Sequence, residues 1–111
     1  MFRIESDGTI KITRGDTARL TVNITNEQDN SDYSIESSDV ITFTVKKYCS
    51  DKNPAFQKIV AGSGAIHIEP NDTAQMRFDT YKYDVQLTKA NGDVYTVIGP
   101  ATFEVLQEVT F

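Results

Sequence analysis

Alternation of apolar and polar residues is the dominant pattern along this chain. Residues 19–25 alternate polar and apolar side chains without interruption, and residues 41–46 and 81–88 repeat the same period of two. A period of two places successive side chains on opposite faces of a strand, so each run predicts a strand with one buried face. The polar positions hold mainly Thr, Lys, Asp, Asn and Gln. A wet face of this kind is typical of antiparallel sheets.

The apolar positions of these runs define the expected core. We predict that the following side chains are buried between two sheets: Leu20, Val22, Ile24, Phe43, Val45, Tyr83, Val85, Leu87 and Phe103. Ile10 and Ile12 share one face of an earlier run, and Val105 and Val109 extend the last one. The intervening Thr21 and Thr44 are expected on the solvent side.

Turn residues separate the runs. Residues 26–32 are all polar and predict a loop, and residues 62–64 (Gly-Ser-Gly) predict a break. Asn91-Gly92 lies between two strand patterns and predicts a tight hairpin, because both residues tolerate positive φ. Two segments are ambiguous. Gly99-Pro100 predicts a bulge or a change of sheet, and residues 54–60 predict an edge strand or a bulged strand.

One short helical turn is expected at residues 71–76. Pro70 would start it, with Asn71 or Asp72 as the cap. About seven or eight short strands with one such turn favour an all-β, immunoglobulin-like two-sheet antiparallel sandwich. A chain of 111 residues has room for one core, so residues 1–111 are expected to form a single β-sandwich domain.

Charge and cysteine content narrow the function classes. The formal net charge is −5 and the basic residues do not cluster, which disfavours nucleic acid and membrane surfaces as partners. The single Cys49 does not allow an internal disulfide framework and suits a reducing compartment. Residues 1–5 lack the apolar core of a signal peptide, so we expect synthesis in a cytoplasm or a leader already removed.

Several segments could carry chemistry, and each also has a simpler interpretation. Arg14-Gly15-Asp16 spells a cell-adhesion tripeptide, but Gly and Asp between two strands are also what a tight turn needs. The acidic set Asp29, Asp32, Glu36 and Asp39 could offer oxygen ligands to calcium, yet it lacks helix-loop-helix spacing. We therefore expect a turn and a solvated loop, respectively.

The sequence offers no obvious catalytic set. His67 is the one histidine. Because Ile66 and Ile68 on either side of it are expected to face the core, His67 is expected on the solvent-facing side of the strand. Ser63 between two glycines lacks the context of a nucleophile elbow. Cys49 is expected to be an incidental thiol. We predict that the chain is not an enzyme and has no catalytic, cofactor-binding or metal-binding residues. Tyr81 and Tyr83 are similar to the tyrosine corner of immunoglobulin sandwiches, a structural feature.

The order of the segments resembles a known family. The segments are residues 10–17, 20–24, 39–47, 69–73, 81–87, 91–98 and 103–105 with 108–110. They resemble the N-terminal domain of baseplate upper proteins from phages and prophages of Gram-positive bacteria, and related tail proteins. The resemblance covers nearly the whole chain, and its motifs build the fold rather than perform chemistry.

This resemblance implies a structural module of a phage tail or baseplate that docks onto other virion proteins. It further implies a protein made in the bacterial cytoplasm and located in the virion, with a possible homo-oligomer that would be a trimer if joined to a downstream coiled coil. No cofactor is expected. Tyr48, Tyr95 and Thr96 are expected on an exposed strand face, where they could add adhesive surface, but the docking partner and interface are not predicted.

The alternative from a different class is a carbohydrate- or cell-surface-binding β-sandwich. A concave aromatic cluster or a metal site would favour it. Against it, the chain has no Trp to stack against a sugar ring.

Overall fold

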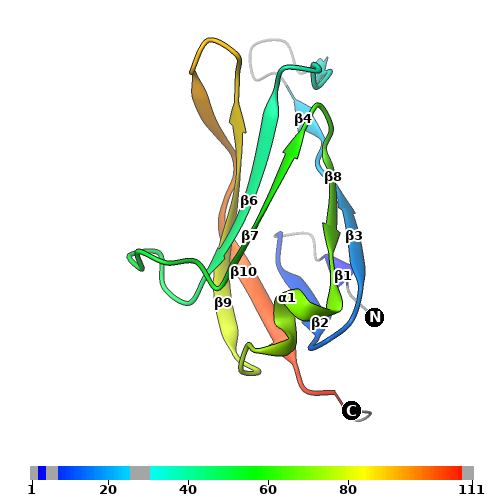
Figure 1. Cartoon of the computed structure of the whole chain (residues 1–111), viewed down its shortest axis with the longest axis vertical. Helices are drawn as coiled ribbons and strands as arrows, with labels where there is room; N and C mark the ends of the chain where they lie inside the picture. Colours follow the sequence, from blue (N-terminus) through cyan, green and yellow to red (C-terminus); the bar gives the residue numbers. More distant parts are fainter. Residues whose placement is uncertain (1–2, 5–7, 26–30, 109–111) are drawn as a thin grey trace.

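The fold consists of two facing layers of strands and one short helix. The computed structural model describes residues 3–4, 8–25 and 31–108. Asp29, most of the predicted 26–32 loop and Val109 lie outside these residues. In the described part of the chain, strands dominate, and the prediction of an all-β fold is confirmed (Figure 1).

The strands are short at the start of the chain and long at its end. They are β1 (Arg3–Ile4), β2 (Ile10–Thr13), β3 (Ala18–Thr21), β4 (Ile24–Thr25), β5 (Asp32–Tyr33), β6 (Val40–Lys46), β7 (Phe56–Ala61), β8 (Ala65–Ile68), β9 (Thr80–Thr88) and β10 (Val94–Leu106). Helix α1 (Pro70–Ala74) connects β8 to β9.

One layer is a six-stranded sheet in the order β1-β2-β10-β9-β6-β7. The pair β3–β8 faces it from the other side of the core, and β4 and β5 form a separate short pair (Figure 1). Most neighbours are antiparallel, as predicted. The exception is β2, which runs parallel to β10 with Ile10 opposite Phe103. The prediction of a purely antiparallel sandwich is therefore wrong at this pair.

The parallel pair has a simple physical basis. Ile10 and Ile12 of β2 lie beside Phe103 and Val105 of β10 on the buried face, and polar residues alternate with them. Periodicity fixes which face of a strand is buried but not the direction of its neighbour, because both directions keep the same alternation.

The predicted core is confirmed except at one residue. Eight of the nine predicted side chains are buried, whereas Ile24 in the two-residue β4 is only partly buried. Thr21 is exposed and Thr44 lies on the outer face of the sheet, as expected. Aromatic rings fill the centre of the core. The ring centroid of Phe43 lies 5.3 Å from that of Tyr83 and 6.2 Å from that of Phe103.

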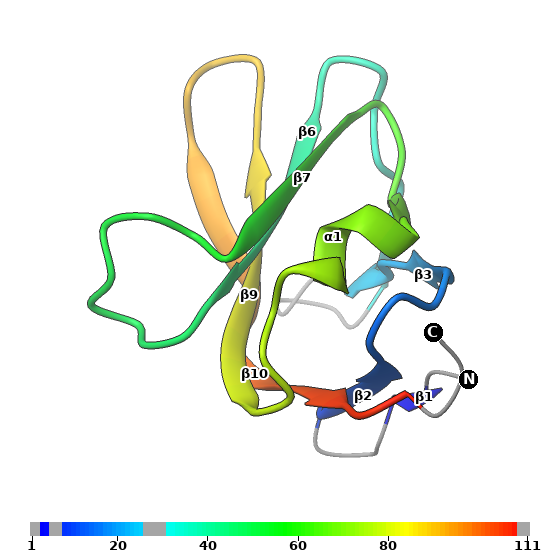
Figure 2. The same ribbon diagram turned by 60° about the horizontal axis from the view of Figure 1, so that its bottom comes forward.

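The helix closes one end of the sandwich (Figure 2). It runs from Pro70 to Ala74 rather than over residues 71–76. The N-cap is Glu69, so the predicted caps Asn71 and Asp72 are wrong. Asp72 stands at the third helical position, and its carboxylate accepts a 2.7 Å hydrogen bond from the Glu69 N–H. This reciprocal arrangement satisfies backbone donors at the helix start.

The structure settles both segments that were ambiguous in the sequence. Residues 56–61 form β7, which is an edge strand of the large sheet. Gly99-Pro100 lies inside β10 at a bulge, and the strand stays in one sheet on both sides of it. A Cβ added to Gly99 would lie 2.8 Å from the Asp84 Cβ, so the bulge can press against β9 only with glycine there.

The β9–β10 hairpin is confirmed. Gly92 has a φ of +94°, and its N–H donates a 2.9 Å hydrogen bond to the Lys89 carbonyl. The Lys89 N–H in turn donates to the Asp93 carbonyl at 2.8 Å, which makes these two residues the last bonded pair of the ladder. The glycine therefore sits in a left-handed position of a short hairpin loop.

Replacing Phe43 with alanine should lower the free energy of unfolding by about 3–5 kcal/mol, because the vacated site is packed on all sides. Urea denaturation of the two proteins checks this value. Thr44→Ala on the opposite face of the same strand should cost far less. Equal losses would show that the burial of this strand is inverted.

Replacing Gly92 with valine should lower the free energy of unfolding by about 1–3 kcal/mol, because a β-branched residue is strained at this positive φ. No atom lies within 4 Å of the added Cβ position, so the cost comes from the backbone alone. Gly92→Asn should lose less, since asparagine tolerates the left-handed region. Thermal melts of the three proteins should rank glycine, asparagine, valine.

Candidate functional site

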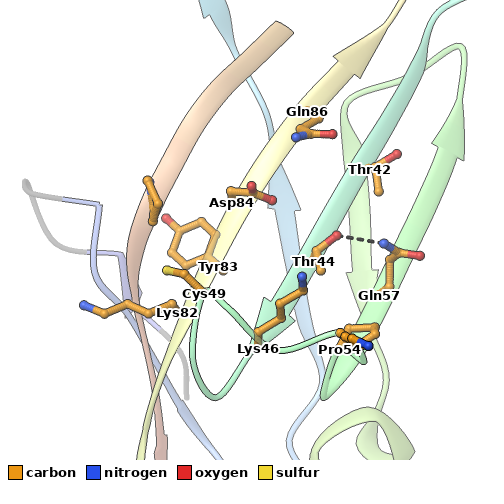
Figure 3. Close-up of a pocket in the computed structure, with 12 residues that line it drawn as sticks. Thr42, Thr44, Lys46, Cys49, Pro54, Gln57, Lys82, Tyr83, Asp84 and Gln86 are labelled. Atoms are coloured by element: carbon orange, nitrogen blue, oxygen red, sulfur yellow. Dashed lines mark hydrogen bonds between the residues drawn. The ribbon is translucent and has the colours of Figure 1, made fainter. Parts of the chain in front are cut away.

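A shallow hollow lies on the outer face of the six-stranded sheet, and it is the first candidate for a binding site (Figure 3). Its volume is about 320 Å³. Strands β6, β7, β9 and β10 contribute its floor, and the loop between β6 and β7 contributes one wall. The lining residues are Thr42, Thr44, Lys46, Cys49, Lys52, Pro54, Gln57, Lys82, Tyr83, Asp84, Gln86 and Pro100.

The floor of this hollow is polar because it is the wet face of the strands. Thr42, Thr44 and Gln86 alternate with the buried apolar residues of β6 and β9. The amide nitrogen of Gln57 donates a 2.9 Å hydrogen bond to the Thr44 hydroxyl, which orders one corner of the floor (Figure 3). Hydroxyl and amide groups in this arrangement can form hydrogen bonds to a polar ligand.

The chemistry available in the hollow is limited. Asp84 is the one carboxylate among its twelve lining residues, so the lining lacks the carboxylate pair that glycoside hydrolysis uses. The ring of Tyr83 packs in the core on the other side of the sheet, and its hydroxyl donates to the Gly8 carbonyl. The lining therefore presents polar groups without an aromatic face on which a sugar ring could stack.

A second hollow of about 440 Å³ lies between α1 and the start of β7. It is open and mixed in character, with Phe56, Met76 and Tyr81 beside the polar side chains of the helix. The hydroxyl of Tyr81 donates a 2.9 Å hydrogen bond to the carbonyl of Arg77, four residues earlier. This bond pins the segment that leads into β9, so Tyr81 has a structural role here.

Asp39 is the strongest departure from the sequence-based expectation. The prediction of a solvated acidic loop is wrong at this residue, because Asp39 is only 1% exposed, whereas Asp32 and Glu36 are exposed. Its Oδ2 accepts a 2.6 Å hydrogen bond from the Tyr33 hydroxyl and a 2.9 Å bond from the Glu36 N–H. Of the residues considered as possible calcium ligands, the three that the structure describes therefore differ in burial.

Lys89 completes a cluster with Asp39 and Tyr33. Its ammonium group donates to the Tyr33 hydroxyl and lies 3.9 Å from Asp39 Oδ1. Donation from Tyr33 holds the pKa of Asp39 below its usual range, and the Glu36 N–H acts in the same direction. The bond to Tyr33 raises the pKa of Lys89. The cluster fastens the 31–39 segment to the end of β9, so it stabilises the fold rather than forming an open site.

The sequence carries no signal for this cluster. Lys89 follows Asp39 by fifty positions, and both stand in polar surroundings along the chain. Among the described residues, no group of three or more His, Cys, Asp or Glu side chains could hold a metal ion.

The Arg14-Gly15-Asp16 tripeptide forms a tight turn, as predicted. The Asp16 N–H donates a 3.0 Å hydrogen bond to the Thr13 carbonyl, and Gly15 has a φ of +84°. The Gly15 N–H also donates to the hydroxyl of Thr73 in α1 at 2.8 Å. This turn thus joins the end of β2 to the helix.

Arg14 is occupied by contacts within the chain. Its guanidinium donates to both carboxylate oxygens of Glu108, at 2.9 and 2.6 Å, and lies 4.9 Å from the centre of the Phe78 ring. This pairing holds the pKa of Glu108 below its usual range. The Arg14 guanidinium therefore has a structural role, because Glu108 and Phe78 hold it against the rest of the domain.

The remaining candidate residues are not brought together. His67 is exposed on β8 opposite Arg19, as predicted, and Cys49 is exposed on the β6–β7 loop. The Ser63 hydroxyl accepts a 3.0 Å hydrogen bond from the Ala65 N–H and so belongs to the turn before β8. Their positions in different elements give no shared reactive centre.

Large apolar side chains lie on the surface at several places, and the sequence pattern predicts only some of them. Within the described residues, those exposed are Tyr48, Ile59, Phe78, Val94 and Tyr95. Tyr48 and Tyr95 are exposed as predicted, but Tyr48 lies in the loop between β6 and β7 rather than on a strand face. Ile59 lies on the edge strand β7, and Val94 and Tyr95 begin β10. Exposed aromatic and aliphatic groups of this kind mark places where another protein can pack.

Replacing Asp39 with asparagine should destabilise the fold near neutral pH, and the difference should shrink in acid. The pKa of Asp39 is lowered by folding, so its contribution is complete above the ordinary carboxyl value of about 3.9 and is lost as the pH falls through the lower folded value. Urea midpoints near pH 7 and at about pH 3 measure this difference. Asp32→Asn, at an exposed position of the same segment, should change neither midpoint appreciably. A constant difference for Asp39→Asn at both pH values would contradict the ionised role.

No family model, curated protein or solved structure matches this chain at a significant level. No helix in the described ranges is long and apolar enough to cross a membrane.

Proposed function

We propose that this domain is a non-enzymatic structural module of a phage or prophage tail or baseplate, and that it docks onto other virion proteins. The observation that carries the proposal is the exposure of Tyr95 and Val94 at the margin of the large sheet, where they are 51% and 54% exposed. An apolar group held out by a rigid strand is a suitable anchor for a protein partner, because little side-chain entropy is lost on binding. The sequence resemblance to baseplate upper proteins indicates which kind of partner.

An immunoglobulin-like arrangement of the sandwich fits this proposal. Three features support it: the parallel pairing of β2 with β10, the placement of β3 and β8 in the opposite layer, and the hydroxyl of Tyr81 bonded to the backbone four residues upstream. The last feature corresponds to a tyrosine corner at the entry to the penultimate strand. Sandwiches of this kind commonly act through their faces, edges and loops.

The absence of catalysis is part of the proposal. His67, Cys49 and Ser63 stand on separate elements, and the hollow on the outer face holds a single carboxylate among its lining residues. General acid–base or nucleophilic chemistry needs such groups within hydrogen-bond reach of one another. The proposed location is the virion, after synthesis in a bacterial cytoplasm.

A carbohydrate- or cell-surface-binding module is the second candidate, and the polar hollow of Figure 3 favours it. Thr44, Gln57 and Gln86 provide hydroxyl and amide groups at the floor, and Asp84 provides a carboxylate. Such groups recognise sugar hydroxyls by hydrogen bonding. The two candidates use different surfaces, since the hollow lies on the face of the sheet whereas Tyr95 lies at its margin.

Light scattering should separate the two candidates. The domain is mixed in turn with candidate baseplate proteins from the same genome, and the expected result is a complex of defined mass with at least one of them. Tyr95→Ser should weaken that complex, while Thr42→Ala in the hollow should leave it unchanged. If the domain binds none of these proteins but binds a purified cell-wall glycan, and Gln86→Ala abolishes that binding, the structural role is wrong and the second candidate replaces it.

A further inference from the structure

The first half of β10 is an unpaired edge of the large sheet. β9 covers one side of β10 from Val94 onward, but β2 pairs on the other side only with residues 103–106. In both ribbon views this half of the strand lies at the outer margin of the molecule, and no described strand lies beyond it (Figures 1 and 2).

The backbone groups that face outward along this edge follow from the ladder. Lys89 and Asp93 form a bonded pair, and bonded and non-bonded pairs alternate in an antiparallel ladder. Tyr95 therefore bonds to β9, while the N–H and C=O groups of Val94 and Thr96 point away from it. Within the described residues no strand pairs with these groups, and they are available to a further strand.

The edge at β10 differs from the edge at β7 in its charge. β7 carries Lys58 on its partly buried side, where the ammonium group forms a 2.7 Å ion pair with Asp72 of α1. An inward-pointing charge of this kind guards an edge against pairing with another chain. Residues 94–103 of β10, in contrast, include no charged residue. The edge at β7 is therefore protected, whereas the unpaired half of β10 is not.

We propose that the first half of β10 pairs with the first half of β10 in a second copy of this chain, antiparallel and about a two-fold axis through Tyr95. This register sets Val94 opposite Thr96 of the second copy, so the outward N–H and C=O groups of both residues are bonded in both chains. A two-fold axis through Thr96 would instead place Val94 opposite Ile98. Ile98, which pairs with Val85 of β9, lies between the two register shifts of β10, where the regular alternation of inward and outward backbone groups is interrupted. The bonding between the two copies of β10 would therefore be incomplete in that register.

The side chains along this edge are also compatible with a two-fold axis through Tyr95. Tyr95 stands opposite its own symmetry mate at a non-bonded position, where Cβ atoms approach to about 4.5–5.5 Å and aromatic pairs are favourable. Asp93, the nearest charged residue, stands opposite Val97 rather than another acid. A second copy suits this edge because the edge is self-complementary about Tyr95: the outward groups of Val94 and Thr96 satisfy each other in both chains. The edge also carries no charge, so the repulsion expected between two copies of net charge −5 is smallest here.

This inference rests on the proposed function, in which the domain acts by contact with other chains, and it names one partner and one surface. The test is disulfide trapping. With Cys49 changed to serine to remove the exposed thiol, Tyr95→Cys should form a covalent dimer on mild oxidation, because the two sulfurs would lie across the axis within bridging reach. Ile59→Cys in the same background is the matched control, since Ile59 is also highly exposed (65%) but lies on the guarded edge.

The expected result is at least a tenfold excess of covalent dimer for Tyr95→Cys over Ile59→Cys at equal concentration. Thr96→Pro should abolish the excess, because proline removes an outward N–H while leaving the bonds to β9 intact. Circular dichroism checks that each variant is folded. Equal cross-linking of the two cysteine variants would overturn the inference. If the two cysteine variants cross-link equally but the domain still binds a tail protein, the inference fails and the proposed function stands. If they cross-link equally and the domain binds no tail protein, both fail.

Discussion

The contact among Phe43, Tyr83 and Phe103 is the interaction on which the rest of the molecule depends. The three rings come from β6, β9 and β10, which are adjacent in the large sheet, and all three project from the same face. A slip of one residue between any two of these strands would turn a ring out to solvent and bring a polar residue in. The register of the central strands is therefore fixed by aromatic packing, and the polar floor of the outer hollow follows from that register.

Features that depend on local pattern could be predicted from the sequence. The alternation in residues 41–46 and 81–88 identifies the buried and exposed faces correctly, and Asn91-Gly92 locates the hairpin. These features depend only on residues close together in the sequence: alternating side chains on a strand, or turn residues that tolerate a positive φ. The tight turn at Gly15 could be predicted for the same reason.

Features that depend on distant partners could not be predicted in this way. Asp39 is buried beside Tyr33 of its own segment and Lys89 from the end of β9, and nothing near it in the sequence indicates the lysine fifty positions away. The direction of β2 relative to β10 is equally non-local. The large exposed apolar residues could be predicted only in part, since the sequence predicts Tyr95 at the surface but not Val94 or Ile59.

The parallel pairing of β2 and β10 has a mechanical consequence. The chain runs into β2 at Ile10 and leaves β10 at Leu106, so a pull applied to the two outer ends drives these neighbours past each other along their length. All the backbone bonds between them are then strained at once in shear, rather than opened one after another as in a hairpin pulled from its free ends. The bidentate grip of Arg14 on Glu108 lies at the same junction and opposes the same displacement. A domain in which the first and last strands of the core pair in parallel resists tension between its ends, a property suited to a link that bears load.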